Sequence, residues 1–392
     1  MKQHNSSLGL VMLFVVIVSW VSSSLLLNTI FESNYYKKPI FITFCSVSSC
    51  SIYLFPLWKQ TLKSYIKNNQ WDIQTAYISL YYNKGTNDLS TNEKYQDHME
   101  NDNIESTNNN FNSQIIPLKS IIKLSLLFCI LWFSANLTTN ISLSYTSVTS
   151  QTILSSTASF FTLFFGVLFG IDTINIHKLI GLIISLCGII IIITKSIGSS
   201  TDSFNHLSHK NIIIGDCLAL LGALIYGIYS TIFKRSIQKI NQQYSQFNAI
   251  TPQIDIKLVL GFIGLFTLIG FWPILVLFHY TEIETFQFNW DFKIISIIIL
   301  NSLITFLSNF CWAKAIILTT PLTVTVGLSL TIPLAMIGDF VFKGKQVTIW
   351  YIIGAILIIS SFILINDASN ERQELEPLLK GTNTGTYGSI EV

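Results

Sequence analysis

Length, composition and charge place this chain in a lipid bilayer. It has 392 residues, of which 50% are hydrophobic and only 11% are charged, whereas soluble domains carry roughly a quarter charged residues. So little charge cannot cover a water-exposed surface, which excludes an ordinary soluble globular protein. The net charge of +2 is nearly balanced. Nucleic-acid binding would need lysine and arginine clustered on a folded face, so nucleic acid is excluded as a partner.

Ten apolar stretches are long enough to cross a bilayer as helices. A helix needs about 20 residues to cross a hydrocarbon core of about 30 Å, and a helix satisfies its own backbone there. The first stretch is longer than the apolar region of a secretory signal, so we interpret it as a span. The sequence predicts an all-α membrane protein with ten transmembrane helices at residues 8–30, 39–58, 121–143, 148–169, 178–193, 212–233, 258–280, 294–317, 321–342 and 347–366.

The fifth span is the shortest of the ten. Lys178 and Lys195 flank it, and we expect both side chains to snorkel toward the headgroups, so that a short apolar core can still cross. Pro321 separates spans eight and nine, because proline suits a helix start and disrupts a helix interior.

Two polar segments interrupt or follow the spans. Residues 59–117, between spans two and three, contain too few apolar residues to fold alone. We predict a disordered cytosolic loop there, and a regulatory or partner-binding role is the alternative. Residues 367–392 form a tail. Most lysines and arginines fall on the side that holds this loop, which favours cytosolic positions for both termini.

The chain contains an internal repeat. The hydroxyl-rich span that starts near Ser144 and runs to Gly166 matches the span that ends at Gly338, at a shift of 172 positions, and Gly181 and Gly354 recur at a shift of 173. Five spans per copy is an odd number, so two copies enter the membrane with opposite orientations. We predict two inverted five-helix repeats: residues 1–58 with 118–195 form the first, and residues 196–366 form the second. Chance similarity between apolar helices is the alternative.

Two blocks of sequence resemble a known family. They are residues 135–140 (ANLTTN) with 144–157 (SYTSVTSQTILSST), and residues 312–315 (WAKA) with 320–322 (TPL) and 327–334 (GLSLTIPL). These blocks resemble the F subfamily of solute carrier family 35, within the drug/metabolite transporter superfamily with its EamA-type repeat. The resemblance implies ten spans, two five-helix repeats, cytosolic termini and solute transport. It implies no particular substrate.

Polar side chains gather in particular spans. Such groups are costly in hydrocarbon, so they face a partner helix or a water-lined path. Span four carries hydroxyl and amide groups at helical spacing on two neighbouring faces, which include Ser159 and Thr162, and span nine is similarly rich in hydroxyls. We predict a substrate cavity near the midplane, lined by Asn136, Asn140, Gln151, Thr152, Ser155, Ser156, Asn309, Lys314, Thr325 and Ser329. Asn301 could join it. Close helix packing through small polar residues is the alternative.

Two further residues in spans eight and nine carry specific hypotheses. Pro333 removes one backbone donor and is expected to leave the carbonyl of Ser329 unpaired, as a ligand group, a hinge or simply a packing bend. Lys314 lies three residues before the end of span eight. It either snorkels to the headgroups or faces the cavity and binds an anionic group.

The tail contains a candidate sorting signal. Glu374, Leu378 and Leu379 lie in the segment ELEPLL, which fits the acidic dileucine pattern that clathrin adaptors read as an extended peptide. This pattern predicts an endosomal, lysosomal or vacuolar membrane, with the Golgi as the alternative.

The sequence shows no pattern of an enzyme or a metal protein. The six cysteines lie in apolar runs without metal-binding spacing, and the six histidines lie in loops or at span ends. We find no nucleophile constellation, phosphate loop or paired catalytic carboxylates. We therefore expect no enzyme activity and no cofactor. The leading hypothesis is a secondary transporter of a small polar organic solute, working by alternating access. A membrane scaffold or receptor without solute flux is the alternative.

Overall fold

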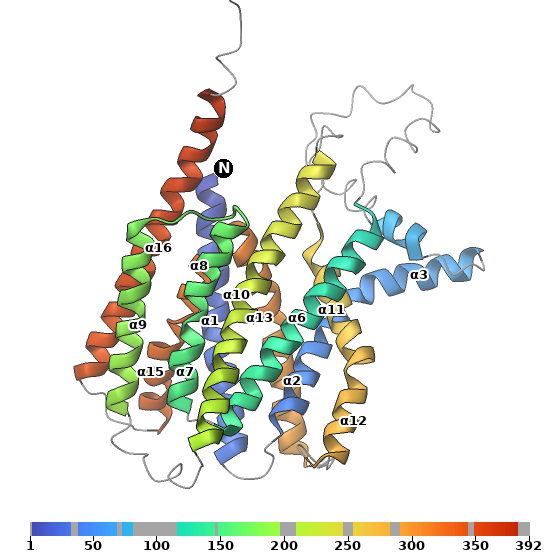
Figure 1. Cartoon of the computed structure of the whole chain (residues 1–392). Helices are drawn as coiled ribbons and strands as arrows, with labels where there is room; N and C mark the ends of the chain where they lie inside the picture. The colour runs from blue at the N-terminus through green and yellow to red at the C-terminus, as the bar shows by residue number, and fades with distance from the viewer. Residues whose placement is uncertain are drawn as a thin grey trace, which may run out of the picture. The chain divides into compact units, whose positions relative to one another are not determined.

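The structure is a computed structural model, and it describes residues 2–32, 38–68, 73–80, 116–145, 148–196, 209–245, 254–282, 291–343 and 349–382. Every regular element in these ranges is a helix (Figure 1). Among the described residues, ten helical stretches are long and apolar enough to cross a membrane. The predicted fold class, an all-α protein with ten transmembrane helices, is confirmed.

The chain divides into two compact units. Unit 1 comprises Met1–Ile40, Leu131–Lys234 and Phe288–Val392, and unit 2 comprises Phe41–Ile130 and Arg235–Gln287. Two long helices, α6 (Leu118–Tyr145) and α10 (His209–Ser245), contribute to both units. This division does not follow the boundary between the predicted repeats, so the two-repeat arrangement stays a prediction.

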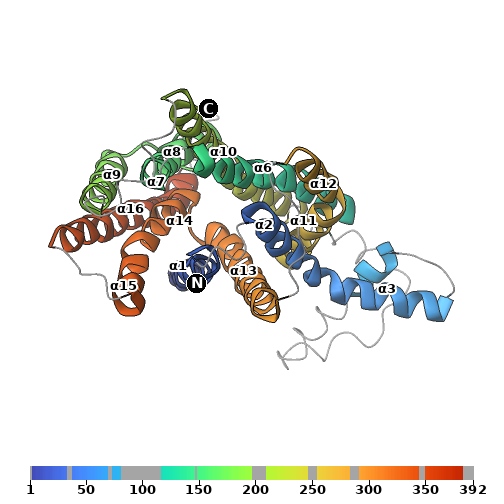
Figure 2. The same cartoon turned by 90° about the horizontal axis from the view of Figure 1, so that it is seen from below.

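In unit 1, the first helix packs on later spans. The helix α1 (Lys2–Glu32) lies beside α13 (Phe292–Leu318), as Figure 2 also shows, and contacts α14 (Pro321–Leu328) and α15 (Thr331–Lys343). Glycine permits this approach, because a Cβ added to Gly9 would lie 2.5 Å from the Thr319 methyl carbon. Leucine, isoleucine and valine side chains from α8 (Ala158–Leu168), α9 (Ile176–Ser196), α14 and α16 (Ile349–Thr382) form an apolar cluster.

The helices α9 and α16 pack closely against each other in unit 1. Gly188 and Gly354 face each other so tightly that a Cβ on either residue would lie 2.8 Å from the carbonyl oxygen of the other. Ser361 also donates a hydrogen bond to the Gly181 carbonyl at 2.7 Å. Lipid tails provide no hydrophobic drive between helices, so small residues and interhelical hydrogen bonds supply the contact.

Unit 2 is built on a similarly close contact. It contains α2 (Pro39–Ser48), the 3₁₀ helix η1 (Ser49–Leu54), α3 (Phe55–Asn68), α11 (Ile256–Gly270) and α12 (Trp272–Tyr280). Gly261 and Gly264 let α11 pack against η1, since Cβ atoms there would lie 2.8 Å from Leu54 Cγ and 2.2 Å from the Ser51 nitrogen.

Several helices extend beyond the bounds of the predicted spans. The predicted disordered loop at 59–117 begins as helix, because α3 continues to Asn68 and residues 73–80 are also helical. Residues 81–115 lie outside the described residues. The fifth span is longer than predicted, because the helix α9 has 21 residues. The helix α16 runs on through Thr382, well into the predicted tail.

We predict that Gly188→Ala weakens the α9–α16 contact. The new methyl group would press on the Gly354 carbonyl oxygen, and such overpacking costs about 1–3 kcal/mol. The measurement is the thermal unfolding of the purified protein in detergent. Gly270→Ala is the matched control, because a Cβ at Gly270 meets nothing within 4 Å. Equal melting temperatures for the two variants would contradict the prediction.

Candidate solute-binding site

Spans four and nine are both broken near their middle. Span four consists of α7 (Val148–Ser156) and α8, with Thr157 between them, and span nine consists of α14 and α15. The N–H of Thr157 donates to Leu154 at 3.1 Å and that of Ser329 donates to Val326 at 3.0 Å, three residues back instead of four. Thr157 and Ser329 lie 172 positions apart, which is the shift of the predicted repeat. Tight turns inside helices often mark functional hinges.

Hydroxyl side chains explain why both helices tolerate a break. Ser156 Oγ donates to the Ile153 carbonyl at 2.6 Å, Thr157 Oγ1 donates to Leu154 at 2.5 Å, and Thr331 Oγ1 donates to Leu328 at 2.6 Å. Each bond satisfies a backbone carbonyl three residues back. These local side-chain bonds compete with the regular helix pattern, and they keep the turn paired where no water reaches it.

The expectation for Pro333 was wrong. Its missing N–H does not leave the Ser329 carbonyl unpaired, because that carbonyl accepts the Ile332 N–H at 3.1 Å. The tight turn before the proline moves the donor by one residue. The carbonyl of Ser329 is therefore already engaged within its own helix.

The helices α8 and α14 meet through two threonines. The Oγ1 atoms of Thr162 and Thr325 lie 3.3 Å apart, and each also bonds a carbonyl four residues back, Ala158 and Pro321 respectively, at 2.7 Å. A hydroxyl has one hydrogen but two acceptor lone pairs. With their hydrogens on the backbone, the two oxygens can accept hydrogen bonds from a third group. The sequence predicted Thr325 as part of the cavity lining, and in the structure Thr162 contacts the hydroxyl of Thr325.

An aromatic cluster lies on the neighbouring helices of unit 1. Trp312 of α13 has its ring centroid 5.6 Å from that of Trp132 of α6, 5.9 Å from that of Tyr229 and 5.8 Å from that of Phe233. Tyr226 packs on Tyr229 at 4.9 Å. Our sequence reasoning missed these rings. The available signal was the helical spacing of Tyr226, Tyr229 and Phe233 along α10.

Hydrogen bonds connect the rings to the threonines. Trp312 Nε1 donates to the Tyr226 hydroxyl at 3.2 Å, and this hydroxyl also hydrogen-bonds Thr325. Polar atoms from α13, α10, α14 and α8 thus form one chain beside stacked rings. We name this set the aromatic-hydroxyl cluster; its members are Trp132, Thr162, Tyr226, Tyr229, Phe233, Trp312 and Thr325. Such a set combines flat apolar rings with neutral hydrogen-bond donors and acceptors.

Other predicted cavity residues bond within their own helix or lie elsewhere. Gln151 Nε2 donates to Ser155 Oγ at 2.9 Å within α7, and Asn136 Nδ2 donates to the Trp132 carbonyl at 2.8 Å within α6. Asn301 accepts a hydrogen bond from Ser23 Oγ at 2.5 Å and so joins α13 to α1.

The remaining candidates keep their status as predictions. Thr152 is half-buried in α7, and Ser329 is half-buried between α14 and α15. On α13, Asn309 is buried and Lys314, five residues later in the sequence, is half-buried. The Asn140 side chain lies outside the described residues, although its backbone belongs to α6.

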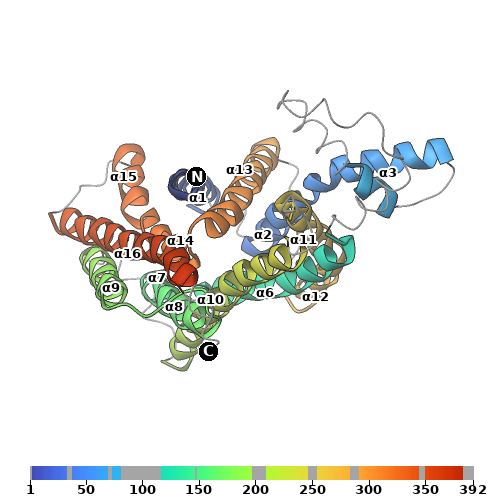
Figure 3. The same ribbon diagram turned by 90° about the horizontal axis from the view of Figure 1, so that it is seen from above.

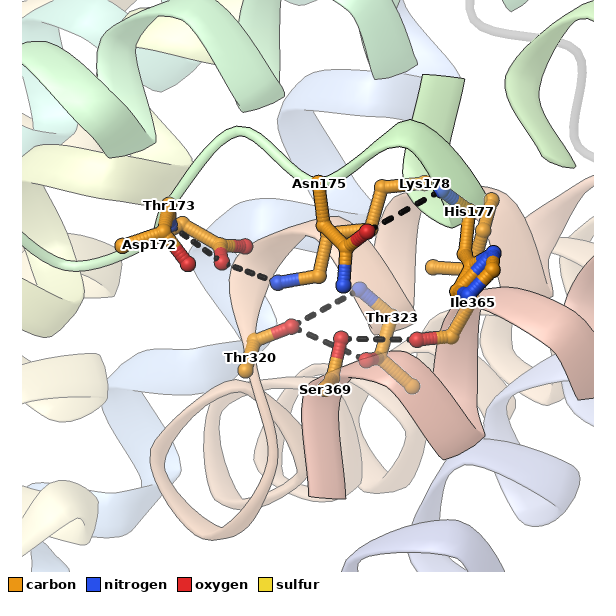
Figure 4. A network of polar contacts seen from close by, with 9 residues as sticks. All are labelled: Asp172, Thr173, Asn175, His177, Lys178, Thr320, Thr323, Ile365 and Ser369. Carbon is orange, nitrogen blue, oxygen red and sulfur yellow. Dashed lines mark hydrogen bonds and ion pairs between the residues drawn. The ribbon is translucent and has the colours of Figure 1, made fainter. Parts of the chain in front are cut away.

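A buried charge network lies at the link between α8 and α9 (Figure 4). Asp172 and Lys178 form an ion pair with side chains only 3% and 1% exposed. The N–H groups of Ile171 and Asp172 both donate to the Gly166 carbonyl, at 2.8 and 2.9 Å. The prediction that Lys178 snorkels was therefore wrong, because its ammonium group is held inside the protein.

A second buried lysine joins two helix ends. Lys234, which is 5% exposed, donates from Nζ to the carbonyl of Thr319 at the end of α13. The adjacent Thr320 caps α14, accepting the Thr323 N–H at 3.1 Å. The lysine thereby satisfies a carbonyl that the helix end leaves without an internal partner.

The sorting motif lies on helical backbone. Glu374, Leu378 and Leu379 all fall within α16, which ends at Thr382, and their side chains are outside the described residues. The expectation of an extended peptide thus differs from the helical backbone of the free chain. Binding in extended form would require this end of α16 to unwind.

Comparison with known proteins gives consistent matches. The EamA-like transporter family matches residues 108–194. The chain is 41% identical to a vacuolar membrane protein of Saccharomyces cerevisiae over 98% of this chain and 95% of that protein. It is 41% identical to a thiamine-repressible mitochondrial transport protein of the same yeast over 92% of this chain and 91% of that protein. Solute carrier family 35 member F5 of Bos taurus is 28% identical, over 93% of this chain and 77% of its own length.

A crystal structure supports the same fold. It matches 93% of this chain and 98% of its own chain with a TM-score of 0.56, at 11% sequence identity. The helical fold and the relatives together define a multi-pass membrane transporter. The chain belongs to the F subfamily of solute carrier family 35, among the EamA-type transporters. This is a family of transporters, which points away from an enzyme.

We predict that Asp172→Asn destabilises the protein more than the double variant Asp172→Asn with Lys178→Met. Removing only the carboxylate leaves a buried ammonium group without its partner, which costs about 3–5 kcal/mol, whereas replacing both charges removes that cost. The measurement is a double-mutant comparison of thermal unfolding in detergent. A double variant that is no more stable than Asp172→Asn would refute this account of the pair.

Proposed function

We propose that this protein is a secondary transporter that carries a small polar organic solute across an endomembrane by alternating access. The observation that carries this proposal is the matched pair of breaks in spans four and nine, beside the aromatic-hydroxyl cluster. In transporters, interrupted helices commonly form the solute site near the midplane, where two repeats meet. The solute would bind there through neutral hydrogen bonds and ring stacking.

The same breaks support a route for the conformational change. A turn that is paired by hydroxyl groups can alter its bend without exposing carbonyls to lipid, because each hydroxyl can rotate to a new acceptor. Alternating access by two inverted repeats would use both turns as hinges. Lys314, close to Trp312 in sequence, would bind an anionic group of the solute or act as its countercharge.

The proposed location is the vacuolar membrane. One relative is named as a vacuolar membrane protein, and the tail carries Glu374, Leu378 and Leu379 in an acidic dileucine pattern. Another relative is named as mitochondrial. Imaging of the tagged protein against vacuolar and mitochondrial markers distinguishes the two.

The test of transport has two stages. Thermal stabilisation of the purified protein is first screened with nucleotide sugars, vitamins, amino acids and peptides. The stabilising compound is then followed into proteoliposomes. Solute-dependent flux supports the proposal, whereas a compound that stabilises the protein without crossing the membrane identifies a receptor or scaffold with a transporter fold.

We predict that Thr325→Val reduces flux by a factor of about 5 to 150, since losing a hydrogen bond of a buried polar network costs on the order of 1–3 kcal/mol. Thr267→Val is the matched control: Thr267 is also buried and bonds a carbonyl four residues back, but it lies on α11 beside Cys129.

We also predict that Lys314→Ala abolishes uptake while the protein is expressed at the normal level. Unchanged flux in both Thr325→Val and Lys314→Ala would overturn the assigned site, although not transport itself.

We predict that replacing Leu378 and Leu379 by alanine moves the protein from the vacuole to the plasma membrane or Golgi, because the apolar pocket of an adaptor would lose its ligand. The measurement is fluorescence microscopy of the tagged chain, with Leu375→Ala as the control within the same segment. Continued vacuolar residence of the double variant would show that these leucines are not the sorting signal.

A further inference from the structure

The helix α3 differs in composition from the spans around it. Its sequence, FPLWKQTLKSYIKN, contains three lysines and no acidic residue. The candidate span Ile40–Ile66 includes most of α3 and is 27 residues long, whereas about 20 residues suffice to cross the hydrocarbon core. Counted from Ile40, the part of α3 beyond Lys59 is therefore surplus to the span.

One face of α3 is covered by the protein. Leu57 and Thr61 are buried, and Gln60 Nε2 donates to Ser79 Oγ at 2.9 Å. In the helical residues 73–80, Tyr77 donates from its hydroxyl to the Ile116 carbonyl at 2.8 Å. The residues 73–80 thus lie between α3 and the start of α6, so α3 is fixed to unit 2 through this face.

The opposite face of α3 is apolar and exposed. Its residues recur every three or four positions and occupy roughly a quarter of the helix circumference; they are Phe55, Trp58, Leu62 and Ile66. Trp58 is 69% exposed, whereas Leu57, one position earlier, is 5% exposed. Lys59 and Lys63 are exposed and follow directly along one edge of this apolar face, and Lys67 continues their spacing.

The direction of α3 also differs from that of the spans of unit 2. Figure 1 shows it turning aside after η1, and Figure 3 shows it extending outward beyond α2 and α11. This direction, at the end of a span, is the one expected of a helix that lies along the membrane surface.

We propose that α3 is an interfacial helix that binds anionic lipid headgroups in the leaflet where span two ends. Phe55, Trp58, Leu62 and Ile66 enter the boundary between headgroups and acyl chains, and Lys59 and Lys63 contact the negatively charged phosphates. Amphipathic helices with lysines beside an aromatic and aliphatic face bind membranes in this way. The all-cationic charge of α3 complements an anionic surface. This proposal rests on membrane insertion and does not depend on transport.

The test uses hydrogen–deuterium exchange of the full-length protein in nanodiscs. The discs contain either phosphatidylcholine alone or phosphatidylcholine with phosphatidylserine. We expect amides of residues 55–68 to exchange more slowly with the anionic lipid, by a factor of about five for each lysine at low salt, and this difference should shrink as salt screens the charges.

Two double variants distinguish the effect of the α3 lysines from the effect of positive charge elsewhere in unit 2. Lys59→Gln with Lys63→Gln should remove the dependence on phosphatidylserine. Lys119→Gln with Lys123→Gln should retain it, because these exposed lysines lie on α6 in the same unit. Exchange across α11 reports in each case whether unit 2 is folded.

Two results would overturn the proposal. The first is equal exchange of residues 55–68 in the two lipid compositions for the wild-type protein, which is the outcome expected if another protein segment covers this face. The second is a phosphatidylserine dependence that survives in folded Lys59→Gln with Lys63→Gln. The first result is measured on the wild-type protein alone. The proposal can therefore be contradicted even if the lysine variant does not fold.

Discussion

Every backbone N–H and C=O inside the hydrocarbon core needs a partner from the protein, because no water is present to supply one. The regular helix meets this demand at no extra cost, so each departure from it must be repaired locally. At Thr157 and Ser329 the repair is a shift to bonds three residues back, together with serine and threonine hydroxyls that take up carbonyls. At Thr319 it is the ammonium group of Lys234. The hydroxyl-rich composition of spans four and nine follows from this demand.

The same constraint explains how helices associate in this protein. Since lipid and leucine are equally apolar, contacts between helices depend on close backbone approach and on polar bonds across the interface. Gly188 and Gly354 provide the first between α9 and α16, and Ser361 provides the second. Asp172 and Lys178 form a polar contact of a costlier kind, because two charged groups must be removed from water to form their buried ion pair beside Gly166.

The aromatic-hydroxyl cluster combines both uses of polar groups. Trp312, Tyr226 and Thr325 satisfy one another through hydrogen bonds, and our proposal assigns the same rings and oxygens to solute binding. In our proposal, α3 presents lysines next to aromatic and aliphatic residues at the membrane surface, where water relaxes this demand.

The ten spans and the all-helical fold could be predicted from the sequence alone, because hydrophobic length decides whether a segment crosses a bilayer. Family membership was likewise readable from the blocks around Asn136 and Trp312. The sequence also marked spans four and nine as unusual, since their hydroxyl groups stand out against an apolar background. Thr325 was predicted as a cavity residue for the same reason.

Only the tertiary structure decided what these groups contact. Hydropathy treats Lys178 as a flanking charge, and the ion pair with Asp172 became visible only when the α8–α9 link folded back. The helical spacing of aromatic residues along α10 could be read from the sequence, but the contacts of Tyr229 with Trp132 and Trp312 join three helices that are far apart in the chain, and no local pattern predicts them. Local composition determines whether a segment enters the membrane, whereas the partner of a buried polar group depends on helix packing between residues far apart in the chain.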